Sequence, residues 1–464
     1  MVKPSHVKSK PVRPGTAPRK YRKKSRVQGK QSPRWVWIWL GLTGIGVVSA
    51  MAGAILAISL SATPLRRVLL SSEDNALFSQ GGSITSDSLS LPKLTRSVNV
   101  LILGTKVLTG DLDNPPPDLG YQQVVDSVDG LSDTMILVRF DPTRYKLTAL
   151  SIPRDTPVRL SGYGEMKINA ANLHGGAPLT ARAVSQLLNG VPIDRYVRIN
   201  VQAVEKLIDA LGGVTLYVPN DMKYTDHSQH LYIDLKQGEQ HLDGNKATQF
   251  LRFRYDRYGD IGRVQRQQLL IRAVIEQAIR PQTLLKLPKI FNVIQENIDT
   301  NLTVEELAAL VGFAANTKRD DVQMLMLPGA FNGTGTNEVS YWLPDERGIR
   351  RIMANHFEQG LGGVADSTPE RVRIAIQNST GSEGAIAALQ DSLRAQGYGN
   401  FFMANNWNEP LETTRIIAQK GDQGVAAQIQ LALGIGEVRV ESTGELSSDI
   451  TIQLGRDWLQ LRRP

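Results

Sequence analysis

The feature that most constrains the fold of this chain is an uncharged apolar run, Trp35–Ala62. A helix needs about 20 such residues to cross a bilayer, and this run is longer. It begins with Trp35, Trp37 and Trp39, an arrangement typical of the aromatic belt at a membrane interface. The apolar core of a cleaved signal peptide is shorter, about 7–15 residues. The run therefore predicts a retained transmembrane helix rather than a cleaved leader.

Charge is unequal on the two sides of this run. Residues 1–34 contain twelve Lys and Arg and no acidic residue, whereas only Arg66 and Arg67 follow the run closely. Because the whole chain carries +8, the remainder carries −4. The positive-inside bias predicts a single pass through the cytoplasmic membrane, with the basic tail inside and the bulk of the chain outside. A basic tail beside a membrane favours contact with anionic membrane lipid, and we expect no nucleic-acid partner.

Strand-like and helix-like segments alternate beyond the run. Strand patterns occur at Val98–Thr105, Thr134–Phe140 and Lys146–Ile152, and helix patterns at Ala177–Gly190 and Val201–Gly213. Such alternation predicts an α/β fold, here an α/β/α core with a mixed central sheet. We predict six parts: a basic tail (1–34), a transmembrane helix (35–62), a polar linker (63–95), the core domain (96–359), a second linker (360–370) and a small C-terminal α/β domain (371–464).

A dense block of charge in the core domain, Leu251–Gln267, is the first candidate site. We interpret LRFR as a strand that places Arg252 and Arg254 on one face. Paired guanidiniums suit phosphate oxygens, which they bind bidentately. The segment after it has a helical pattern and carries Arg263 and Arg266 on its first turns, where a helix N-terminus favours anions. The alternative is that the block is a solvated charged face.

Three other segments carry polar side chains where a strand ends or a helix begins. The side chains are Asp133, Arg154, Asp155, Lys167 and Asn169. Singly, each has a structural alternative: Asp133 caps a turn, Arg154 pairs with Asp155, and Lys167 is solvated. Together they suit the binding of a pyrophosphate, with carboxylates for a divalent cation or a general base. The chain has no Cys, which excludes thiol chemistry and Cys-based metal sites.

Six segments resemble, in order, the motifs of the LytR–CpsA–Psr family of cell-envelope proteins: NVLILGT, DGLSDTMILVRFDP, ALSIPRDTPV, KINAANLHGG, PIDRYVRINVQAVEKLIDALGGVTLYVP and FLRFRYDRYGDIGRVQRQ. The resemblance covers 96–280 and continues in the helices to 358, while 371–457 resemble the LytR-type C-terminal domain. It implies a membrane-anchored phosphotransferase that moves a glycan from a polyprenyl-pyrophosphate carrier to an envelope acceptor, commonly a peptidoglycan hydroxyl. The lipid tail is then expected in an apolar tunnel, with arginines and Mg²⁺ at its mouth.

The resemblance also implies roles for single residues. Phosphate-binding arginines fall on Arg154, Arg252, Arg254 and Arg263, with Lys167 beside them. Asp133 corresponds to the family's aspartate ligand of Mg²⁺. Asp260 corresponds to the acidic residue proposed to polarise the acceptor hydroxyl. From the charge pattern we add Arg266 and Asn169 as substrate-binding residues.

Two positions depart from the family pattern. Leu131 stands where an Arg is common, and Lys106 stands where a second metal-binding Asp is common. Either Asp126 or Asp129 supplies the missing carboxylate, or the Lys106 ammonium takes over part of the charge neutralisation. These departures keep open a second function, a non-catalytic polyprenyl-lipid-binding or scaffolding protein. A third, transcriptional attenuation, has only the basic tail in its favour. The C-terminal domain lacks a titratable cluster and is interpreted as a binding or spacing module that transfer does not require.

Overall fold

The computed structural model describes residues 70–79, 82–85, 92–106, 128–227, 231–253, 259–332, 341–360 and 368–461. All of them belong to one compact unit that spans Ala52–Pro464. The predicted transmembrane run, the basic tail, Arg254 and Asp126 lie outside the described residues. Among the described helices, none combines the length and the apolar character needed to cross a membrane.

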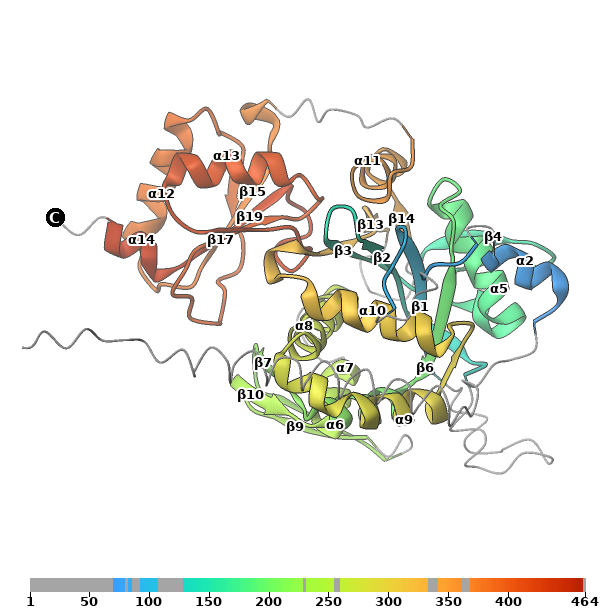
Figure 1. Ribbon diagram of the computed structural model, residues 1–464. Coiled ribbons are helices and arrows are strands. Elements are labelled where there is room, and N and C mark those ends of the chain that lie inside the picture. Colours follow the sequence, from blue (N-terminus) through green and yellow to red (C-terminus); the bar gives the residue numbers. More distant parts are fainter. Residues whose placement is uncertain are drawn as a thin grey trace, which may run out of the picture. The chain divides into compact units, whose positions relative to one another are not determined.

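A mixed sheet of six strands forms the centre of the fold (Figure 1). Its order is β11-β6-β1-β2-β3-β12, with β1 parallel to β6, β3 parallel to β12, and the remaining neighbours antiparallel. The strands are β1 (Val98–Lys106), β2 (Leu131–Asp141), β3 (Lys146–Ile152), β6 (Arg195–Asn200), β11 (Ile298–Thr300) and β12 (Val322–Met326). The mixed central sheet expected from the sequence is therefore confirmed.

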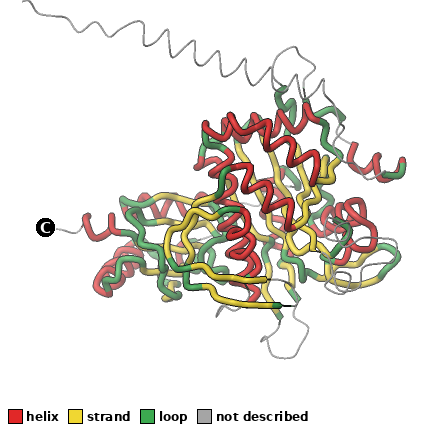
Figure 2. Tube along the Cα trace, turned by 90° about the horizontal axis from the view of Figure 1, so that it is seen from below, coloured by secondary structure: helices red, strands yellow, loops and turns green. Residues whose placement is uncertain are grey.

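Helices cover both faces of this sheet, and Figure 2 shows strands lying between helices. Leu101 and Leu137 pack on one side in a core that includes Val184 of α5 and Ile352 of α11. Side chains that point the other way, such as Val138, pack with residues of α8 and α10. The covering helices are α5 (Ala170–Leu187), α6 (Val201–Leu211), α8 (Gly259–Ala278), α9 (Leu287–Asn297), α10 (Val304–Asn316) and α11 (Glu346–Phe357). The arrangement is the predicted α/β/α core.

Local sequence explains where several helices begin and end. Thr303 and Glu306 form a reciprocal capping box at the start of α10, as their spacing predicts. Gly212 ends α6 in the left-handed region, with φ 86°, which glycine adopts without strain. Part of the predicted linker 63–95 is also helical: α2 (Ser72–Ser79) carries Phe78, which is buried in the core.

The predicted strand at LRFR is wrong. Residues up to Arg252 form the end of helix α7 (Gly244–Arg252), and the chain becomes extended only at Phe253. The helix begins at Asp243, whose side chain accepts a hydrogen bond from the Lys246 backbone N–H. Ala247, Phe250 and Leu251 then follow at helical spacing. Apolar–polar alternation over four residues is too short to separate a strand from the last turn of a helix.

Short two-stranded sheets border the core. Their strands are β4 (Pro157–Leu160) with β5 (Gly164–Lys167), β7 (Val214–Val218) with β10 (Gly238–Leu242), β8 (Met222–Asp226) with β9 (Leu231–Leu235), and β13 (Gly329–Phe331) with β14 (Trp342–Pro344). The four strands β7, β8, β9 and β10 pack on α7 and α8 through a separate apolar cluster.

The C-terminal domain is a small α/β unit, as predicted. Its sheet has the order β16-β15-β19-β17-β18. The elements are β15 (Ile374–Asn378), α12 (Glu383–Ala395), β16 (Phe401–Met403), β17 (Arg415–Ala418), α13 (Gln423–Leu433), β18 (Glu437–Arg439), β19 (Ile450–Leu454) and α14 (Arg456–Leu461). The segment after β18 pairs with the outer edge of β12: the Met324 N–H donates to the Val440 carbonyl at 2.9 Å, and the Ser442 N–H donates to the Met324 carbonyl at 2.8 Å. The domain thereby covers a sheet edge that would otherwise expose unpaired backbone groups.

Candidate phosphate-binding site

The site candidates of the core domain gather at one edge of the central sheet. The directions of the strands bring the carboxyl ends of β1, β3, β6 and β12 to this edge, together with the start of β2. Loops that leave the carboxyl ends of strands are common ligand sites in α/β sheets. Asp133 lies at the start of β2, and Arg154 and Asp155 directly follow β3.

A β-bulge sets the position of Asp133. On β2, Thr134 pairs with Gly104 and Ser132 pairs with Thr105, so Asp133 is the extra residue between them. Bulges re-aim side chains and are common beside active sites. Gly104 allows the strands to approach here, because an added Cβ would lie 3.0 Å from the Thr134 Cβ.

Four side chains form a continuous chain of ion pairs, which we call the Asp133 cluster: Asp133, Arg154, Asp155 and Lys167. Arg154 Nη1 lies 2.8 Å from Asp133 Oδ1, and Arg154 Nε lies 3.3 Å from Asp155 Oδ2. Asp155 Oδ1 in turn lies 2.6 Å from Lys167 Nζ. The Arg154 and Lys167 side chains are 21% and 27% exposed, so both cations are reachable from solvent.

Backbone hydrogen bonds hold the cluster in place. The Asn169 N–H donates to the Arg154 carbonyl at 3.3 Å, and the Ser132 N–H donates to the Asn169 carbonyl at 3.1 Å. These bonds tie the loop after β3 to the start of α5 and to the bulge on β2. Asn169 stands at the N-cap position of α5, and its side chain makes no capping bond there. The structure thus places Asn169 beside the cluster.

Helix α8 approaches the same place. Gln267 Nε2 donates to Thr134 Oγ1 at 3.3 Å, and Val264 and Gln267 line a small crevice with Asp133 and Arg154. By the helical repeat, position 260 shares the face of Val264 and Gln267. The side chains of Asp260 and Arg263 lie outside the described residues. Sequence reasoning missed Gln267; its spacing of seven residues from Asp260 was the available signal.

Neither Arg252 nor Arg266 lines this crevice. Arg252 is the last residue of α7 and is half-buried. Arg266 is 3% exposed, donates to the Phe253 carbonyl, and lies 5.7 Å from the centre of the Phe253 ring. Burial lowers the pKa of Arg266 to about 10, which leaves it charged at neutral pH. The contact of Arg252 and Arg266 with the substrate therefore stays a prediction.

Carboxylates at the predicted metal site have basic partners. Asp129 lies 2.9 Å from Arg198 Nη1, and Arg198 Nε lies 2.6 Å from the buried Asp299. Lys106 pairs with Leu131 across β1 and β2, so the two departures from the family pattern are neighbours. Within the described residues, no group of three or more His, Cys, Asp or Glu side chains is arranged to hold a metal. Any metal here needs further ligands from a substrate or solvent.

Comparisons with known proteins agree with the motifs. The family model described as the LytR_cpsA_psr family matches residues 71–358, and that described as LytR cell envelope-related transcriptional attenuator matches 371–458. The polyisoprenyl-teichoic acid–peptidoglycan teichoic acid transferase TagV of Bacillus subtilis is 33% identical over 49% of this chain and 60% of its own length. The corresponding TagU transferase of Oceanobacillus iheyensis is 31% identical over 57% of this chain and 77% of its own length.

A solved structure matches somewhat more than half of the chain. The crystal structure of B. subtilis TagV has a TM-score of 0.46 and 29% identity, and the comparison covers 56% of this chain and 95% of that one. The curated TagV of B. subtilis is matched over only 60% of its length, so the chain spans well under the full length of that relative.

Proposed function

The chain belongs to the LytR–CpsA–Psr family, and from this membership we propose that it is a membrane-anchored phosphotransferase of the cell envelope. It moves a glycan from a polyprenyl-pyrophosphate carrier to an acceptor such as peptidoglycan. Relatives named as teichoic acid transferases support the transfer of a glycopolymer. The observation that carries the proposal is the Asp133 cluster, which presents two cations at the sheet edge beside the first turns of α8.

Arg154 and Lys167 bind the pyrophosphate in this proposal. In the structure both are paired with carboxylates, and both remain partly exposed. Phosphate oxygens can therefore replace or share these partners without the cost of burying a new charge. A guanidinium held by two carboxylates is also pre-oriented, which reduces the entropy lost when the ligand binds.

The transfer breaks one bond and forms one. The acceptor hydroxyl oxygen attacks the phosphorus that carries the glycan, the bridging P–O bond breaks, and polyprenyl phosphate leaves. Asp260 takes the hydroxyl proton. Because the negative charge spreads over phosphate oxygens in such reactions, Arg154, Arg254 and Arg263 stabilise the transition state electrostatically.

Asp133 fits a magnesium site to which the substrate contributes. Its Oδ1 accepts from Arg154, while Oδ2 has no partner among the described residues. Mg²⁺ is usually bound by one or two carboxylates together with phosphates and waters. We therefore assign Asp133 as the protein ligand, with pyrophosphate oxygens completing the site. A bound Mg²⁺ would neutralise part of the negative charge on the phosphate oxygens.

The proposed location is the cytoplasmic membrane, with Trp35–Ala62 as anchor, the N-terminus inside and membrane lipid around the span. A protease added outside intact cells should then cleave the C-terminal domain and spare residues 1–34. Cleavage of the tail with the C-terminal domain intact would reverse this topology.

The full-length protein in detergent tests the activity. Incubation with a polyprenyl-pyrophosphate-linked glycan, an acceptor and Mg²⁺ should release polyprenyl phosphate, and Arg154→Ala should reduce this release. Arg350→Ala is a matched control, because within the described part of the chain this exposed arginine pairs only with Glu346, one turn away. Saturable binding of the lipid without any release would instead support the non-catalytic lipid-binding function.

A further inference from the structure

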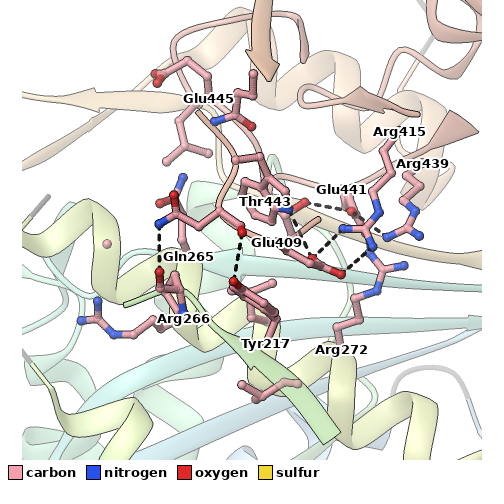
Figure 3. Close-up of a pocket in the computed structure, with 18 of the residues that line it drawn as sticks. Tyr217, Gln265, Arg266, Arg272, Glu409, Arg415, Arg439, Glu441, Thr443 and Glu445 are labelled. Carbon is pink, nitrogen blue, oxygen red and sulfur yellow. Dashed lines mark hydrogen bonds and ion pairs between the residues drawn. The ribbon is translucent and has the colours of Figure 1, made fainter. Parts of the chain in front are cut away.

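A second cavity lies along another side of α8 (Figure 3). Its volume is about 560 Å³, within the range of roughly 300–1,000 Å³ that is common for small-molecule sites. Residues of α8, β7 and the β13–β14 hairpin line it from the core domain, and residues 405–409, β17, β18 and 443–447 line it from the C-terminal domain. Neither domain alone encloses this space.

Specific contacts fix the two walls to each other. Gln265 Nε2 of α8 donates to the Gly444 carbonyl at 2.8 Å, and the Tyr217 hydroxyl donates to the Asn408 carbonyl at 2.9 Å. Arg272 of α8 pairs with Glu441 of the C-terminal domain, as Figure 3 shows. These bonds come from different elements, so they determine the width of the cavity.

Charge in the lining is nearly balanced. Six arginines and five glutamates line the cavity, a formal excess of one positive charge. Both Nη atoms of Arg415 lie 3.0 Å from the Glu409 carboxylate, which leaves this guanidinium neutralised by a bidentate pair. A polyanion would meet these carboxylates as well as the arginines, so the lining suits a polar ligand without net charge.

The remaining lining offers hydrogen-bonding groups beside aromatic rings. Trp342 is 4% exposed, and its Nε1–H has no partner among the described residues. The Nε1 atom is covered and packs against Gly329, where an added Cβ would lie 2.5 Å from it, so Trp342 offers its ring and not this donor. Trp407 and Tyr217 contribute aromatic surface, and Asn405 contributes an exposed amide. Sugar hydroxyls both donate and accept, and the C–H faces of sugar rings pack on aromatic rings.

The cavity is next to the phosphate-binding site. Phe331 lines both the cavity and the crevice beside Asp133. Its ring centre lies 5.0 Å from that of Trp342, whose backbone N–H donates to the Asp155 carbonyl at 3.0 Å. The cavity and the crevice therefore share Phe331 of the β13–β14 hairpin as a common wall.

We propose that this interdomain cavity binds a short uncharged oligosaccharide, so that the C-terminal domain contributes directly to glycan recognition. The inference rests on the proposed function only for the origin of the oligosaccharide. In the cell it belongs to the lipid-linked donor glycan or to the acceptor glycan strand. Binding itself does not depend on transfer. It can therefore be tested separately.

Calorimetric titration of the full-length protein in detergent with N-acetylglucosamine tetramer is the direct test. We expect saturable binding, at least tenfold weaker in Trp407→Ala, which removes an aromatic wall. Phe402→Ala is the matched control: this aromatic residue belongs to the same domain and contacts Arg373 instead of the cavity. No saturable binding, or equal affinity in Trp407→Ala and Phe402→Ala, would overturn the proposal.

Measurement of the KM values for both substrates identifies the source of the glycan. If the cavity holds the acceptor strand, Trp407→Ala raises the KM for a soluble peptidoglycan strand and leaves the KM for the lipid donor unchanged. If it holds the donor glycan, the reverse is expected. Unchanged KM values for both substrates would contradict the inference. A wild-type protein that binds the tetramer but releases no polyprenyl phosphate would contradict the proposed transfer and leave the cavity assignment standing.

Discussion

Two ion-pair clusters of similar composition lie near α8 in very different surroundings. The Asp133 cluster combines arginine, lysine and aspartate side chains, of which Arg154, Asp133 and Lys167 are 21–27% exposed. The second, which we call the Glu441 cluster, consists of Arg272, Arg439 and Glu441, with exposures of 15%, 11% and 7%. The same kinds of residue thus form an accessible group at the sheet edge and a largely buried group where α8 meets the C-terminal domain.

Burial explains what each cluster can do. Burial lowers the pKa of Arg439 to about 10. Burial by itself acts to raise the pKa of Glu441. Arg272 and Arg439 outweigh that effect, and the pKa of Glu441 is lowered overall. Removing Glu441 leaves Arg272 and Arg439 with only their more exposed partners, Glu276 and Glu437. The cations at Asp133, by contrast, can change partners in contact with water. The comparison separates a structural cluster from one suited to binding.

The largest effect that we predict concerns the structural cluster. Glu441→Ala leaves Arg272 and Arg439 without their buried partner and should lower the free energy of unfolding by about 3–5 kcal/mol. Denaturant unfolding of the full-length protein in detergent measures it. Glu346→Ala, which removes an exposed carboxylate one turn from Arg350, should cost less than about 0.5 kcal/mol. Equal effects of the two substitutions would remove the distinction between the clusters.

The Glu441 cluster also shows which parts of the fold the sequence cannot reveal. Strand β1 was predictable because it is a short β-branched run, and β3 because it is a short apolar segment that follows a turn. Helix α10 was predictable because Thr303 and Glu306 form a local cap. The pairing of Met324 with Glu441 joins residues far apart in sequence, and no local pattern encodes it. The C-terminal domain, interpreted from the sequence as a binding or spacing module, therefore also completes a sheet edge and a cavity.

The members of the Asp133 cluster were predictable from the sequence, whereas their orientation was not. Asp133, Arg154, Asp155 and Lys167 stand where strands end, and the strand order brings them together as expected. The β-bulge that orients Asp133 depends on the register between β1 and β2, which the sequence does not specify. Likewise, Gln267 became a candidate only when α8 was placed against Thr134.

The second prediction tests the accessible cluster. Arg154→Ala should weaken binding of the pyrophosphate lipid by about 1.5–3 kcal/mol, the usual range for hydrogen bonds to a charged group. The unfolding midpoint should change little, because the side chain is partly exposed. Arg252→Ala and Arg254→Ala should weaken binding by similar amounts if these residues contact the same pyrophosphate. Lipid affinity and thermal unfolding, measured on the same samples with Arg350→Ala as control, separate binding from stability.

The third prediction concerns acid stability. The pKa of Glu441 is lowered from 4.5 in the folded protein, so its contribution is present above that pH and is lost as pH falls through the folded value. Below pH 4.5 the protein should lose up to about 1.4 kcal/mol of stability per pH unit from this one group. Glu441→Gln should show a shallower loss over the same range. Identical slopes in the two proteins would show that Glu441 does not titrate differently on unfolding.

The smallest predicted effect concerns magnesium at the accessible cluster. Asp133 is the proposed protein ligand, and Lys106 stands at the end of β1, where the family commonly has a second metal-binding Asp. Without lipid, the wild-type protein should bind Mg²⁺ poorly, because a single partly exposed carboxylate already paired with Arg154 is a weak site. Lys106→Asp replaces a repelling cation with a ligand, and we expect calorimetry to show tighter binding by about 1 kcal/mol, as for other partly exposed charges. Lys93→Asp makes the same charge change at an exposed lysine just before the core domain and controls for net charge. Tight binding by the lipid-free wild type would mean that Asp126 or Asp129 already completes the site, and Asp129 would then have to leave Arg198.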